Sequence, residues 1–173
     1  EDDQAIRIAI FTGAGDKAFS AGMDLKERAE SSSSPIERRA QKLSATIHTQ
    51  TRGVAAITKP TIAAIRGSCV GGGLEFALAC DMRVAAEDAK LGLAEVKRGL
   101  IPGAGGTQRL ARTVGVAKGL EICLTGDNVT GAEALRLGLV NCAVPAGEVM
   151  KAAEDLAKRI LKGAPMSVLF IKE

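Results

Sequence analysis

The stretch that decides the fold is GSCVGGGLEFALACD, Gly67 to Asp81. Three consecutive glycines, Gly71 to Gly73, separate an apolar run that ends at Ile65 from LEFALACD, a segment with the composition of a buried helix. A glycine inside regular structure costs about 0.5–1 kcal/mol relative to alanine, so three in a row indicate a place that only bare backbone can occupy. The pattern predicts a strand, a tight turn and a helix that carries one carboxylate, Glu75.

Strand and helix signals alternate on both sides of this stretch, which predicts an α/β fold in a single domain over residues 1–173. Thr130 and Glu133 form a capping-box pattern at the start of one helix, and Gly138 is its expected stop. Strands are predicted at Ile6–Phe11, Pro60–Ile65, Met82–Glu87, Ala89–Glu95 and Leu139–Val144. Helices are predicted at Pro35–Ile57, Leu74–Asp81, Gly105–Gly115, Val116–Gly126, Ala132–Gly138 and Gly147–Gly163.

The composition limits both the core and the ligand. Of 173 residues, 46% are hydrophobic but only 2% are aromatic, with no Trp and no Tyr, so the core must be built from aliphatic side chains. The net charge of +3 indicates a mild preference for anionic ligands. With only four aromatic residues, all Phe, on which bases could stack, the composition argues against nucleic-acid binding.

Metal, disulfide and triad chemistry find little support in the sequence. Four cysteines, Cys69, Cys80, Cys123 and Cys142, show no CxxC spacing and lie in apolar surroundings, which favours small packing residues over metal ligands. A metal site or a Ser/His/Asp triad would depend on His48, the only histidine.

The chain also carries no sign of a membrane span or a leader. No apolar run reaches the roughly 18 residues of a span, and no signal peptide opens the sequence. The chain begins directly before a buried strand, so we expect residues to precede Glu1, with a targeting segment possible among them.

The glycine turn is a candidate anion site, because a helix start presents free N–H groups and the positive end of a dipole. Its spacing matches neither GxGxxG nor GxxxxGK[ST], which argues against nucleotide phosphates. A developing oxyanion, such as that of a thioester carbonyl during attack or deprotonation, is the remaining candidate.

Two further segments fit acid/base chemistry next to a carbonyl. FSAGMDLKE, Phe19 to Glu27, is a second small-residue turn with Asp24 as a candidate N-cap. AEVKRGLIPGAGGTQRL, Ala94 to Leu110, contains Glu95 and a glycine turn before a helix. Two N–H donors and two carboxylates suit general acid/base catalysis, whereas the alternative makes Glu75 and Glu95 helix-surface charges.

These segments, together with GLVNCAVP (Gly138 to Pro145), resemble the crotonase, or enoyl-CoA hydratase/isomerase, superfamily in the same order over nearly the whole chain. The resemblance implies a spiral of repeated ββα units, an acyl-CoA substrate and a homotrimer or dimer of trimers. It implies no cofactor, since coenzyme A is part of the substrate, and no metal, membrane or nucleic acid. Relatives have strands before Ile6 and helices after Glu173, so the chain is expected to be trimmed at both ends. The expected location is the cytoplasm in a bacterium, with mitochondria possible in a eukaryote.

Carried over by position, the resemblance places the two oxyanion-hole amides at Met23 and Gly72. It assigns Glu75 and Glu95 to the catalytic pair that holds a water, with Glu95 as the donor of the α-proton. The positions assigned to substrate binding are Ala21, Asp24, Leu25, Lys26, Gly71 and Gly103, of which Gly103 matches a backbone contact near the water.

The resemblance leaves the reaction open among related enzymes. Retention of both glutamates favours enoyl-CoA hydration, because Δ3,Δ2-enoyl-CoA isomerases of this pattern generally use one carboxylate. A carnitinyl-CoA-type dehydratase uses a similar pair, and a non-catalytic or RNA-binding relative is a distant alternative. Met23 replaces a common alanine, and LAEV replaces the commoner PE turn around Glu95; both differences could alter acyl-chain preference.

Overall fold

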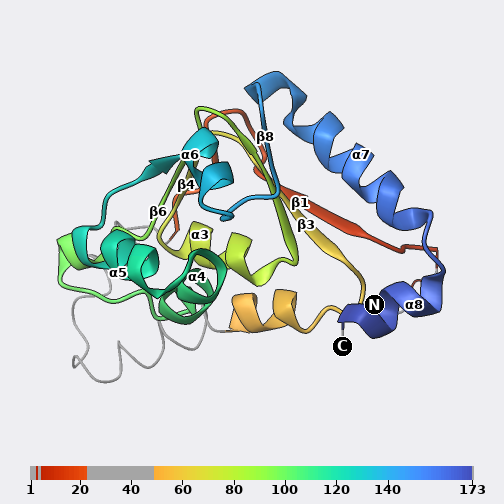
Figure 1. Ribbon diagram of the computed structural model, residues 1–173, viewed down its shortest axis with the longest axis horizontal. Coiled ribbons are helices and arrows are strands. Elements are labelled where there is room, and N and C mark those ends of the chain that lie inside the picture. Colours follow the sequence, from red (N-terminus) through yellow and green to blue (C-terminus); the bar gives the residue numbers. More distant parts are fainter. Residues whose placement is uncertain (1–2, 4, 23–48, 173) are drawn as a thin grey trace.

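The computed structural model describes residue 3, residues 5–22 and residues 49–172, and within them the chain builds two sheets (Figure 1). The first is entirely parallel, in the order β1-β3-β5-β8, and the second has the order β2-β4-β6-β7, with only β7 antiparallel to its neighbour. The first sheet comprises β1 (Ala9–Thr12), β3 (Thr61–Ile65), β5 (Met82–Ala86) and β8 (Cys142–Val144). The second comprises β2 (Ala18–Ser20), β4 (Ser68–Val70), β6 (Lys90–Gly92) and β7 (Val129–Thr130).

From β1 to β6 the strands alternate between the two sheets, so β1, β3 and β5 each continue into a strand of the second sheet. A helical segment at residues 49–55 precedes β3, and α3 (Gly72–Ala79) follows β4. This repeated strand–strand–helix turn confirms the predicted α/β spiral. The later helices are η1 (Glu95–Arg98), α4 (Gly106–Val114), α5 (Val116–Thr125), α6 (Gly131–Arg136), η2 (Ala146–Glu148), α7 (Val149–Leu161) and α8 (Pro165–Lys172).

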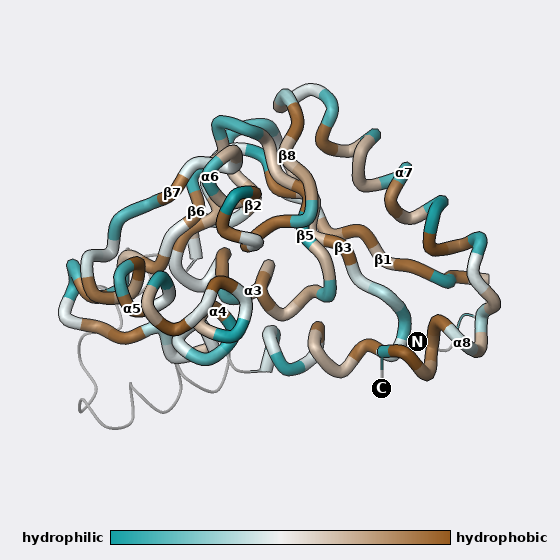
Figure 2. The backbone as a smooth tube through the Cα atoms, in the orientation of Figure 1, coloured by the Kyte–Doolittle hydropathy of each residue, from teal (hydrophilic) through white to brown (hydrophobic). Residues whose placement is uncertain are grey.

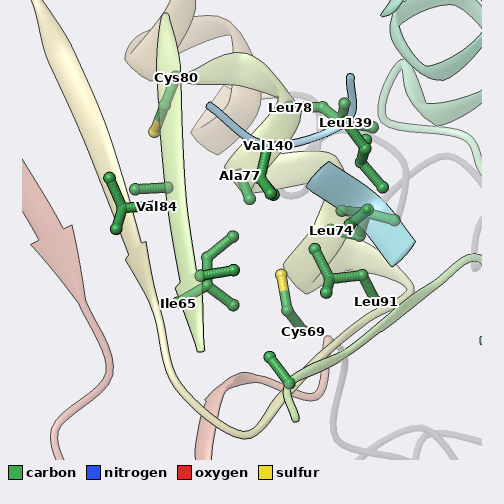
Figure 3. Close-up of a cluster of buried hydrophobic side chains, with 14 of the residues drawn as sticks. Ile65, Cys69, Leu74, Ala77, Leu78, Cys80, Val84, Leu91, Leu139 and Val140 are labelled. Carbon is green, nitrogen blue, oxygen red and sulfur yellow. The ribbon is translucent and has the colours of Figure 1, made fainter. Parts of the chain in front are cut away.

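The core is aliphatic, as the composition predicts. All five residues of β3 are buried, because β1 and β5 flank the strand and α7 packs over it. Figure 2 shows the hydrophobic character of β1 and β3, and Figure 3 shows side chains from both sheets and α3 meeting in one cluster. The largest fully buried side chains are those of Ile62, Ile65, Leu74, Leu91, Leu93, Leu110, Leu139, Val84, Val149, Thr61 and Cys69.

Arg83 is a buried cation that joins three parts of this core. Its guanidinium donates to the carbonyl oxygens of Ala77 at 3.2 Å, Cys80 at 2.8 Å and Leu139 at 2.8 Å. Burial lowers the pKa of Arg83, and the carbonyl dipoles compensate part of the cost of the buried charge. Arg83 thereby closes the carboxyl end of α3, the helix that begins at the glycine turn.

The cysteines behave as packing residues, as predicted. All four thiols are free, Cys69 and Cys80 are buried, and Cys123 and Cys142 are half-buried. Burial raises the pKa of Cys80 to about 12 and raises that of Cys69 further above its usual range. Both core thiols therefore remain protonated and unreactive at neutral pH.

Several short elements differ from the prediction. Strands β2, β4 and β7 are not predicted, because two or three residues carry no readable periodicity, and the terminal helix α8 is not predicted either. The first strand is shorter than Ile6–Phe11 and begins at Ala9. Thr130 does cap α6, its side chain accepting the Glu133 N–H at 3.2 Å. Most of the predicted helix Pro35–Ile57 lies outside the described residues.

Candidate active site

The three glycines that follow β4 have three different surroundings. Gly71 has φ of +57°, and its N–H donates to the Gly92 carbonyl at 2.9 Å. A Cβ on Gly71 would lie 3.2 Å from Glu95 Oε1, so the bare backbone makes room for that carboxylate. A Cβ on Gly73 would collide with the Ser20 carbonyl of β2. Packing within the protein therefore accounts for the missing side chain at Gly71 and Gly73, while the contacts predicted for Gly71 and Gly72 with a ligand stay predictions.

Gly72 is the first residue of α3, where backbone N–H groups have no partner within the helix. Among the described residues, none accepts a hydrogen bond from its amide. Gly22, with φ of +81°, lies directly opposite: a Cβ there would be 3.0 Å from the Gly72 nitrogen. The backbone of residues 21–22 thus passes beside this free amide, and Ala21 and Gly22 are both exposed.

The remaining predicted positions in the first turn lie outside the described residues. These positions are Met23, Asp24, Leu25 and Lys26. The single histidine, His48, also lies outside the described residues. The second predicted oxyanion amide therefore stays a prediction.

Glu75 lies on the first turn of α3 and is only 3% exposed, so its interpretation as a helix-surface charge is wrong. Its Oε1 accepts hydrogen bonds from the amides of Ala104 at 2.7 Å and Gly106 at 2.9 Å. A Cβ on Gly106 would lie 3.0 Å from both Glu75 Cγ and Oε1. The glycine turn before α4 thus wraps around the carboxylate and fixes it. Gly103 is exposed and immediately precedes this pair of amide donors.

Glu95 opens η1 and is held quite differently. Its Oε2 is buried and has no hydrogen-bond partner among the described residues. Burial raises the pKa of Glu95, and the charge of Glu75 raises it further, while its own backbone N–H and Arg98 lower it by less. Glu95 is therefore protonated more readily than an ordinary glutamate.

The two predicted carboxylates are thus brought together, although 19 positions separate them in the sequence. Burial, and then the charges of Glu95 and Glu75, raise the pKa of the Cys123 thiol on α5. The site thus holds one carboxylate that two amides fix, and a second carboxylate oxygen and a helix-start amide that have no partner within the described part of the chain. This arrangement suits proton transfer beside a developing oxyanion.

Sequence reasoning missed the support of both carboxylates. The glycines of PGAGG signal a tight turn, but nothing in the spacing indicates that the Ala104 and Gly106 amides hold Glu75. Likewise, the Gly71 contact with Glu95 joins two different turns of the spiral.

In the part of the chain that the structure describes, no cluster of three His, Cys, Asp or Glu residues could bind a metal ion, and no helix is both long and apolar enough to cross a bilayer.

Known proteins are similar to this chain in sequence and in fold. A sequence model of the family described as Enoyl-CoA hydratase/isomerase matches residues 1–173. The chain is 46% identical over 175 residues to enoyl-CoA hydratase domain-containing protein 2, mitochondrial, of Bos taurus, an alignment that covers 99% of the chain and 58% of that protein. It is 40% identical over 173 residues to the short-chain-enoyl-CoA hydratase of Clostridium acetobutylicum, with 100% and 65% covered.

The crystal structure of an enoyl-CoA hydratase from Bacillus anthracis has 43% identity and a TM-score of 0.92, covering 99% of this chain and 65% of that one. This agreement confirms the predicted fold class. The chain spans 58% to 65% of the length of these three relatives.

Proposed function

The chain belongs to the enoyl-CoA hydratase/isomerase family, and on that premise we propose that it is an enoyl-CoA hydratase, a hydro-lyase that converts a 2-enoyl-CoA and water into a 3-hydroxyacyl-CoA. The observation that carries the proposal is the unequal pair of glutamates. Glu75 is buried and fixed by two amides, whereas Glu95 has a raised pKa and a buried oxygen to which no described residue donates a hydrogen bond. Hydration needs one group that accepts a proton from water and another that gives a proton to carbon.

The free Gly72 amide supports a role in polarising the thioester carbonyl. As the double bond is attacked, electron density moves onto the carbonyl oxygen, and a preorganised N–H at a helix start stabilises that charge. The family resemblance supplies Met23 as the second donor. The substrate thioester would lie against the Gly72 amide, near the bare backbone of Gly22.

The proton transfers then follow from the two carboxylates. The water oxygen bonds to C3 while its proton passes to the Glu75 carboxylate, and the electron pair of the double bond moves through C2 toward the thioester oxygen. The resulting enolate takes a proton at C2 from Glu95, so one water is added and both glutamates exchange protonation state. The raised pKa of Glu95 supports its role as the donor, since it favours the protonated acid before reaction.

A second candidate reaction is Δ3,Δ2-isomerisation, which needs one carboxylate to move a proton. The observation in its favour is that Glu75 Oε1 already accepts two amides and so has a structural function. In that case Glu95 alone would remove and return the proton.

Absorbance of the conjugated enoyl thioester distinguishes the two reactions. Purified protein mixed with crotonyl-CoA should bleach this absorbance as water adds to the double bond. A gain of absorbance from a 3-enoyl-CoA, without bleaching of crotonyl-CoA, would instead identify an isomerase. A panel of acyl-CoA substrates of different chain length, with crotonobetainyl-CoA included, then assigns the substrate. Light scattering separately tests the homotrimer or dimer of trimers that we propose.

A further inference from the structure

Glu95 lies on a very short helical element, η1, that has few contacts of its own to fix its position. η1 is a single 3₁₀ turn, and none of its four residues is buried. Its backbone hydrogen bonds run from Lys97 N to the Ala94 carbonyl and from Gly99 N to the Val96 carbonyl, both at 3.2 Å, and from Leu100 N to the Glu95 carbonyl at 3.1 Å. Isolated 3₁₀ turns are weakly stabilised because their hydrogen-bond geometry is poor. A carboxylate that must meet a carbon atom in a fixed direction therefore needs support from another element.

That support comes from the turn that ends α5, which we call the 126–128 turn (Gly126, Asp127 and Asn128). Gly126 is buried and has φ of +67° at the carboxyl end of α5. A Cβ at Gly126 would lie 3.0 Å from Val96 Cγ1 and 3.2 Å from Lys97 Cγ and Cε. The bare Gly126 backbone is thus packed directly against η1, one residue beyond Glu95.

Two neighbouring contacts extend the same support. Asn128 packs against Gly92 at the end of β6, and β6 pairs with β7 through Leu91 and Val129, so the two segments run side by side. Lys97 Nζ lies 2.7 Å from Asp127 Oδ1, but these side chains are 53% and 74% exposed. An exposed ion pair of this kind contributes little, so the packing at Gly126 is the main contact.

From these contacts we propose that the 126–128 turn is a positioning device for Glu95, with Gly126 as its central residue. It touches no reacting atom and acts through the backbone of η1. The inference rests on the proposed function, in which Glu95 delivers the proton to carbon. Its specific consequence is that a methyl group at residue 126 displaces η1 through Val96.

The test compares Gly126→Ala with Gly138→Ala in the purified protein. Both glycines follow helices with positive φ, +67° and +73°, but a Cβ at Gly138 meets nothing within 4 Å. We expect Gly126→Ala to lower kcat for hydration of crotonyl-CoA about ten- to a hundredfold with KM within about twofold, the size of effect produced by a small misplacement of a catalytic group. Gly138→Ala should keep the wild-type kcat.

Rescue separates positioning from general damage. The double variant Gly126→Ala/Val96→Ala removes Val96 Cγ1, the nearest atom that the new methyl would meet, and leaves only the flexible Lys97 side chain, so it should recover most of the lost kcat. Should Gly126→Ala fail to fold, Gly126→Asn carries the same Cβ and tolerates positive φ better. An unchanged kcat in a folded residue-126 variant, an equal loss in Gly138→Ala, or no rescue by Val96→Ala would overturn the proposal.

A second readout is independent of the reaction. Amide hydrogen exchange at Lys97, Gly99 and Leu100, the donors of the η1 turn, should become faster in Gly126→Ala and stay unchanged in Gly138→Ala. If the wild-type protein does not hydrate crotonyl-CoA, the proposed function is wrong, and the exchange rates still decide whether this turn holds η1. Unchanged exchange in Gly126→Ala would overturn the inference by itself.

Discussion

The two glutamates of the site have the same side chain and opposite surroundings. Glu75 accepts two backbone N–H groups, while Glu95 Oε2 is buried without a partner among the described residues. Hydrogen-bond donors favour the charged form of a carboxyl group, and burial disfavours it. Both carboxyl groups are at least partly buried, so the two amide donors are what distinguish Glu75 from Glu95, a difference that residue identity alone does not reveal.

Gly72 offers a sharp test of the oxyanion hole because it stands at the first helical position. Proline is tolerated there but has no N–H, whereas alanine keeps the N–H and would find its Cβ 3.5 Å from Gly22 Cα, an ordinary contact. Loss of one oxyanion donor costs about a hundredfold or more in kcat. We therefore expect Gly72→Pro to lose at least that much, and Gly72→Ala to lose far less, in steady-state assays with crotonyl-CoA. Equal activity of the two folded variants would remove Gly72 from the oxyanion hole.

The raised pKa of Glu95 also predicts how stability depends on pH. Because folding makes this carboxyl bind its proton more tightly, its contribution to stability is fully present below the unfolded pKa of about 4.3 and is lost as pH rises through the folded pKa. Glu95→Gln is neutral at every pH. Its Tm should therefore exceed that of the wild type at pH 7, with the difference vanishing toward pH 4. A Tm below that of the wild type at pH 7 would contradict a raised pKa.

At the scale of the element, the helix α3 and its glycine turn were readable from the sequence, but the reasons for the individual glycines were not. Strand β3 and helices α3, α4, α5 and α7 follow from apolar runs and from glycines at their ends. Gly73, in contrast, is required because β2 passes against it, and Gly71 because Glu95 does. Those neighbours lie tens of residues away, so local patterns carry no information about them.

Gly73→Ala is expected to damage packing rather than chemistry. Its Cβ would strike the Ser20 carbonyl, a backbone atom that cannot rotate away. Overpacking of this kind costs about 1–3 kcal/mol of unfolding free energy. Urea denaturation should show that loss relative to Gly72→Ala, whose Cβ has room. A Gly73→Ala protein as stable as Gly72→Ala would show that α3 and β2 do not approach as described.

At the scale of the whole molecule, the spiral assembles the site from separate turns. Glu75 follows β4, Glu95 follows β6, and the amides that hold Glu75 lie just before α4 and at its first residue. The family resemblance could assign Glu75 and Glu95 as a pair, but their spacing could not place them together. The 126–128 turn, which supports η1 from the far end of α5, was equally beyond prediction. Such contacts depend on how the sheets stack, which no local sequence pattern encodes.

We propose that both glutamates act on one water, and a double-mutant cycle with crotonyl-CoA tests this mechanism. Glutamine at residue 75 keeps an oxygen that can accept the Ala104 and Gly106 amides, so Glu75→Gln removes the charge while sparing the turn. After circular dichroism confirms folding, each single variant should hydrate about 10²- to 10⁴-fold more slowly than the wild type. Because residues that serve one transition state are not independent, Glu75→Gln/Glu95→Gln should lose much less than the product of the single losses. Near wild-type hydration by Glu75→Gln would contradict the two-glutamate mechanism and leave Glu75 as the residue that holds the turn before α4.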